Sequence, residues 1–150
     1  MAGLYTDARP SVAVTGETED LLLLYADQRR LLTITAQGLT DEQARTRSTV
    51  SELTVGAVIK HLTHGERHTA REIVERDENS QLDMAQLAAG YTFTEDDTLA
   101  HWLTEYQRAA EEFERAVAGV DSLDELIPQP TAPWQSEREW WSVRRIVIHR

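Results

Sequence analysis

The chain has 150 residues, 26 acidic against 15 basic side chains, a formal net charge of −11 and no cysteine. The length suits one domain, residues 1–150, while the missing cysteine excludes disulfides, Cys-based metal sites and a cysteine nucleophile. The charge argues against nucleic-acid and anionic-membrane partners, and with no signal peptide and no apolar run near the ~20 residues of a membrane helix we expect a cytoplasmic protein.

Residues 1–15 read as an extended lead-in, since they carry Pro10 and no hydrophobic period. A first helix is predicted from Gly16, with acidic residues in its first turn, to Gly38 as the residue that ends it. Its inward stripe is predicted to contain Leu21, Leu24, Gln28, Leu31 and Thr35, with Leu22, Tyr25 and Leu32 beside it. Residues 40–43 then form a capping box for a short turn.

A second helix is predicted from near Thr54 to about Asp77, followed by an irregular connection over 79–93 with a short helix at 82–87. A third helix is predicted to begin at Thr94, with the acidic residues 95–97 in its first turn, and to close at Gly119. Its apolar residues recur by fours and threes, which is typical of a bundle seam. No segment alternates convincingly as a strand.

A proline-rich loop over 127–134 leads to a fourth helix capped by Ser142, with Val143, Ile146 and Val147 directed inward. The tryptophans before it, 134, 140 and 141, either cap one end of the core or form a pocket wall. We therefore predict an all-α, antiparallel four-helix bundle. The fourth helix is much shorter than its partners and lacks a stop signal, so we expect it to be cut short at Arg150, with its C-terminal part missing.

The histidines are the concentrated chemical signal, because His61, His64 and His68 share the second helix. His64 and His68 have the i, i+4 spacing that can grip one metal ion from one face. Direction favours His61: at ~100° per residue it lies about 110° from the centre of the apolar face, against about 130° for His68 and about 170° for His64. His149 on the fourth helix is the second candidate. A histidine at the edge of a core can equally be structural.

Two stretches, residues 54–66 and 141–149, resemble the second-helix signature and the fourth-helix start of the DinB-like superfamily, and 39–43 after Gly38 matches in kind and place. The resemblance covers about 17–150 and is closest to an actinobacterial branch. It implies a DinB/YfiT-like bundle with a long second-to-third connection. It also implies a divalent metal, zinc or nickel, held by one second-helix histidine, which maps onto His61, and by two fourth-helix residues expected beyond Arg150, with His149 one turn before them.

Some relatives in this superfamily are thiol transferases that use mycothiol or bacillithiol, including the mycothiol-dependent maleylpyruvate isomerase. The resemblance thus implies a metal-dependent S-transferase whose partners are a low-molecular-weight thiol and an electrophilic substrate. A bound thiol would also suit a chain without cysteine. The alternative is a non-enzymatic, metal-free helical bundle that acts by association. A homodimer is possible if the short fourth helix leaves the core uncovered.

Overall fold

A computed structural model describes residues 8–150, so the first part of the expected 1–15 lead-in lies outside the described residues. Three long helices form the body of the fold: α1 (Gly16–Ala36), α3 (Val55–Glu75) and α5 (Leu99–Ala118). Shorter helices are α2 (Asp41–Arg45), α4 (Met84–Ala89) and α6 (Val143–His149). None of the helices over 8–150 is long and apolar enough to cross a membrane.

Polar caps start α2, α3 and α6 where the sequence predicts them. The hydroxyl of Thr54 accepts a hydrogen bond from the backbone N–H of Ala57, and Ser142 does the same for Arg145 at α6. Thr40 and Gln43 form the predicted capping box at α2. After α1 the chain turns through Gly38 at φ 78°, a left-handed conformation that favours glycine.

The prediction that residues 94–97 open the third helix is wrong, because α5 begins at Leu99 behind the cap Thr98. Asp97 instead accepts hydrogen bonds in the loop before α5. Its carboxylate accepts hydrogen bonds from Lys60 Nζ at 3.0 Å, Trp102 Nε1 at 2.8 Å and the backbone N–H of Thr94 at 2.7 Å. Burial alone would raise its pKa, but these donors together lower the pKa to about 2. The residue therefore anchors the loop to α3 and α5.

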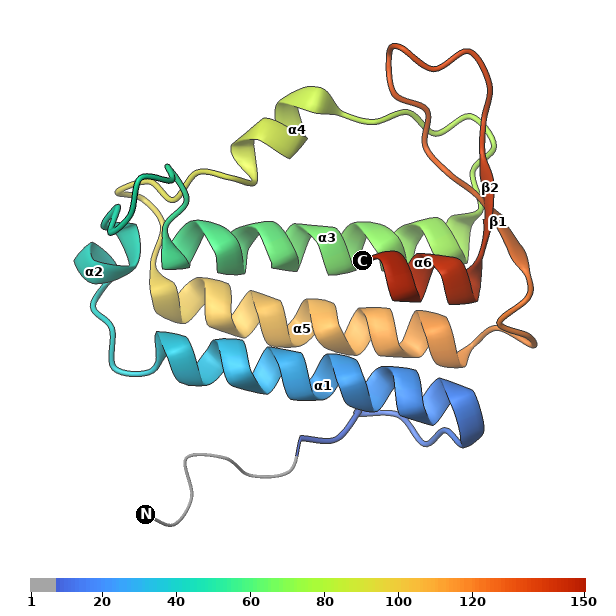
Figure 1. The fold of residues 1–150 in the computed structure, drawn as a ribbon, viewed down its shortest axis with the longest axis horizontal. Helices are drawn as coiled ribbons and strands as arrows, with labels where there is room; N and C mark the ends of the chain where they lie inside the picture. Colours follow the sequence, from blue (N-terminus) through green and yellow to red (C-terminus); the bar gives the residue numbers. More distant parts are fainter. Residues whose placement is uncertain (1–7) are drawn as a thin grey trace.

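The long helices are not simply antiparallel. α3 and α5 run in the same direction, because the connection between them crosses back along the bundle (Figure 1). The ion pair Lys60–Asp97 joins α3 to the loop just before α5, and Arg67–Glu105 joins the two helices further along, as expected for a parallel pair. α1 and α6 run the opposite way (Figure 1). The predicted all-α fold is thus confirmed as mainly helical, but the antiparallel arrangement is wrong for the neighbours α3 and α5.

A small antiparallel sheet, absent from the prediction, introduces α6. It pairs β1 (Leu126–Pro128) with β2 (Trp140–Ser142), in the register Ile127 opposite Trp141. Strands of three residues have no measurable period, so their sequence carries no signal. The sheet delivers Ser142 to the start of α6. Of the tryptophans nearby, Trp141 packs on the core, whereas Trp134 is 73% exposed.

The core has two apolar clusters along the bundle axis. One joins α6 to the ends of α3 and α5 and contains Leu22, Ile73, Phe113, Val143 and Ile146; the other surrounds Ile59, Phe93, Leu99 and Tyr106. A charged layer of Arg29, Glu66 and Glu114 lies between them. The predicted inward stripe of α1 is wrong in part: Leu24 and Leu31 are 61% and 45% exposed, while Leu22, Ala26 and Arg29 are buried.

Candidate functional site

A cavity of about 600 Å³ lies between α1, α3 and the α4 connection, with α6 at one end. α1 contributes Leu24 to its wall, α3 contributes the histidines 61, 64 and 68, and α6 contributes Val147 and Ile148. This volume is within the range of ~300–1,000 Å³ that small-molecule sites occupy. The cavity is therefore the candidate binding site of the chain.

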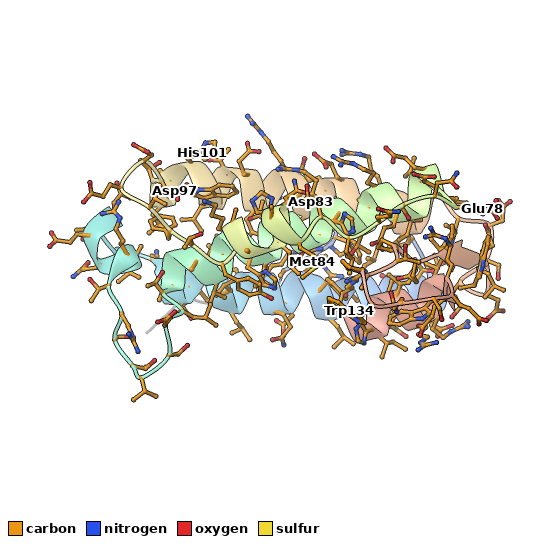
Figure 2. All side chains as sticks on the ribbon, turned by 90° about the horizontal axis from the view of Figure 1, so that it is seen from above. Glu78, Asp83, Met84, Asp97, His101 and Trp134 are labelled. Atoms are coloured by element: carbon orange, nitrogen blue, oxygen red, sulfur yellow. The ribbon has the colours of Figure 1, made fainter. Side chains whose placement is uncertain are left out.

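The roof of the cavity is α4, which crosses over α3 on one side of the bundle (Figures 1 and 2). None of its residues is buried. Its two ends are held instead. Before it, the backbone N–H of Leu82 donates to the Thr131 carbonyl at 2.9 Å; after it, Tyr91 stacks on His61 with ring centroids 4.1 Å apart. A segment held at its ends and unpacked in its middle leaves room beneath it.

Two residues after Tyr91, Phe93 packs against Gly56 in the first turn of α3. A Cβ added at Gly56 would lie 2.6–2.8 Å from the Phe93 ring, closer than real Cβ contacts. Gly65, which lines the cavity, has no atom within 4 Å of the same added Cβ. The two glycines of α3 thus have different roles: Gly56 allows close packing against Phe93, and Gly65 leaves space in the cavity.

The floor of the cavity is the charged layer. Arg29, 8% exposed, donates from Nε to Glu66 at 2.8 Å and from Nη1 to Glu114 at 2.7 Å. Burial raises the pKa of Glu66, while the guanidinium of Arg29 opposes that rise. Tyr25 donates to the carbonyl of Val147 at 2.6 Å, and burial raises its pKa to about 12. These bonds connect α1, α3, α5 and α6 around one polar centre.

The structure places the three α3 histidines on the same cavity wall, including His64, which the helical period directed away from the core. Burial lowers the pKa of His61. Burial first, and then the charges of Lys60 and Arg67, lower the pKa of His64. The Nε2 atom of His68 lies 2.7 Å from Glu72. Burial therefore favours the neutral form of the His61 and His64 imidazoles.

His149 does not lie on the cavity wall with the three α3 histidines. It is exposed, its ring meets the edge of Trp141 at a centroid distance of 4.8 Å, and it is absent from the cavity lining. Over residues 8–150 no three His, Cys, Asp or Glu side chains are arranged to hold a metal ion. The described residues thus do not form the three-ligand set that the resemblance implies, and the metal roles of His61 and His149 stay predictions.

Sequence reasoning missed Arg29, Glu66 and Tyr91. The first two looked like ordinary surface charges of amphipathic helices, and a lone charge near the middle of a helix gives no signal of burial. Tyr91 lies just after a short helix, and nothing in the sequence indicates which side of that helix faces α3. One signal was present: Gly65 within a helical segment, which costs helix stability and indicates a need for space or close packing.

Comparison with known proteins bears on this site. A model of the family described as mycothiol-S-transferase matches residues 20–150, a range that includes every residue lining the cavity. No curated protein matches, and no solved structure matches. The matched range agrees with the DinB-like resemblance of the sequence. The chain therefore belongs to the mycothiol-S-transferase family, a DinB-like family.

Proposed function

We propose that this protein binds a low-molecular-weight thiol of the mycothiol type in the cavity beneath α4 and joins the thiol, through its sulfur, to an electrophilic carbon of a second small molecule. The observation that carries the proposal is a cavity of about 600 Å³ in a chain of this family that has no cysteine. The nucleophilic sulfur must come from a bound molecule, because the chain offers none. The cavity volume is within the range of small-molecule sites.

The chemistry asks for a thiolate, which is the nucleophilic form of the thiol. In the transfer the S–H bond breaks and an S–C bond forms, and the thiol proton passes to an acceptor. The imidazoles of the cavity wall can accept this proton. The α4 roof would exclude water from the reacting atoms, which favours attack by sulfur over hydrolysis.

For a bound metal, the proposal names a single ligand on the cavity wall. His61 lines the cavity and can supply one nitrogen ligand to zinc or nickel, as the DinB-like resemblance implies. His149 would have to turn away from Trp141 to take part. Since residues 8–150 hold no three-ligand group, we derive no step through a metal.

The test fills the cavity without disturbing the fold. Gly65→Phe places a ring in the open space at a helix position where a side chain meets no neighbour at its Cβ. We expect titration calorimetry to show mycothiol binding to the wild type and to Gly65→Ala, and at least about tenfold weaker binding to Gly65→Phe. Conjugate formation with an electrophile, followed by mass spectrometry, should fall in parallel.

Unchanged binding in Gly65→Phe would place the thiol elsewhere. No binding to the wild type would contradict the transferase proposal and favour the alternative of a bundle that acts by association.

A further inference from the structure

Resting on the proposed function, we infer that the electrophile taken by this cavity is an uncharged, apolar molecule, received at an aliphatic mouth formed by Leu24, Leu87 and Ile148. All three side chains line the cavity, and they come from α1, α4 and α6. They are 61%, 41% and 68% exposed, so their apolar surface faces solvent in the empty cavity. A ligand with an aliphatic part would remove that surface from water.

The charges of the cavity argue against an anionic electrophile. Four guanidinium groups line it, and each has a carboxylate beside it. The pairs are Arg29 with Glu66 and Glu114 at 2.8 and 2.7 Å, Arg67 with Glu105 at 2.9 Å, Arg150 with Glu72 at 3.1 Å, and Arg71 near Glu75 at 3.9 Å. A ligand carboxylate would have to compete with a carboxylate already hydrogen-bonded to Arg29, Arg67 or Arg150, and Arg71 has Glu75 at the outer limit of an ion pair.

The negative charge around the cavity also disfavours an anionic electrophile. Asp83, at the start of α4, also lines the cavity, and its carboxylate caps the helix by accepting from the Gln86 N–H at 2.9 Å. The whole chain carries a formal charge of −11. A carboxylate that enters the mouth therefore loses water without gaining a free cation, which is costly. A neutral ligand of the same shape avoids this cost.

The experiment compares two electrophiles that share their reactive group and chain length. N-hexylacrylamide is neutral, and 6-acrylamidohexanoate differs by a terminal carboxylate. In both, the thiol adds across the C=C bond: the S–C bond forms at the β carbon, the π bond breaks, and the thiol proton ends on the α carbon. Rates with mycothiol are divided by the uncatalysed rates. We expect the neutral compound to be favoured by about tenfold or more.

A matched pair of variants locates the effect. Leu24→Lys adds a free cation at the mouth, whereas Leu31→Lys makes the same change at an exposed leucine of α1 outside the cavity lining. We expect Leu24→Lys to abolish or reverse the preference for the neutral compound and Leu31→Lys to keep it. Equal behaviour of the two variants would overturn the assignment of the mouth.

The saturated amides N-hexylpropanamide and 6-propanamidohexanoate cannot react, so saturation-transfer NMR measures their binding apart from catalysis. Tighter binding of the neutral amide without any conjugation of the acrylamides would refute the transferase proposal but support the character of the mouth. Binding of the acid equal to or tighter than that of the neutral amide, or binding of neither, would overturn the inference, whatever the catalysis.

Discussion

Alanine substitution at the two glycines of α3, Gly56 in its first turn and Gly65 in its middle, should change stability in opposite directions. In a helix interior, Gly→Ala gains roughly 0.5–1 kcal/mol, because glycine loses more backbone entropy on folding. At Gly65 the added methyl group meets nothing within 4 Å, so the full gain is expected. At Gly56 the methyl group would lie 2.6 Å from the nearest atom of the Phe93 ring, so that ring must move.

Phe93 is only 8% exposed, and its ring also lies under the guanidinium of Arg45 at 5.7 Å. Overpacking of this kind costs roughly 1–3 kcal/mol. Subtracting the helix gain, we expect Gly56→Ala to be destabilised by about 0.5–2 kcal/mol, and the two variants to differ by roughly 1–3 kcal/mol.

Urea unfolding monitored by circular dichroism measures both variants against the wild type. A difference of 1 kcal/mol should also appear as a shift of about 2–4 °C in Tm for a chain of this size. Hydrogen exchange adds a local readout, since a displaced Phe93 should loosen the segment after α4 in Gly56→Ala alone. Equal stabilisation by both substitutions would show that the Phe93 ring moves freely and does not hold the segment after α4 tightly against α3.

Three further predictions concern charge and metal. Arg29→Leu should destabilise the fold by about 3–5 kcal/mol in urea unfolding, because it leaves Glu66 and Glu114 buried without their partner; a loss below about 1 kcal/mol would mean that water reaches this layer. Asp97→Asn should lower stability most above pH 3.8, and the gap from the wild type should close as pH falls toward about 2, because the folded-state pKa of Asp97 is lowered and its stabilising charge is lost over that window; a gap independent of pH would assign the effect to hydrogen bonds alone. The 150-residue chain should keep far less than one equivalent of zinc or nickel after dialysis, measured by elemental analysis, since residues 8–150 contain no three-ligand group; stoichiometric metal that is lost in His64→Asn but kept in His61→Asn would show that the wrong histidine was chosen.

The sequence by itself determined the positions of most helices. Caps such as Thr54 and Ser142 act through hydrogen bonds to residues three positions away, so a short stretch of chain contains the whole signal. The apolar period placed α3 and α5 within a few residues for the same reason. Where a local alternative competed, as with the acidic residues before α5, the boundary was misjudged, because Asp97 finds its partners on α3 and on Trp102.

Only the tertiary structure decided which face of α1 is buried and what the histidines line. Residues 21–24 are leucine throughout, so the period gives no direction there; the pairing of Arg29 with Glu66 and Glu114 sets it, and Leu24 is left at the mouth of the cavity. His64 points away from the core yet lines the cavity, because the connection between α3 and α5 crosses back over that side. Such placements depend on contacts between segments far apart in the sequence, 37 residues in the case of Arg29 and Glu66, and no local pattern encodes those contacts.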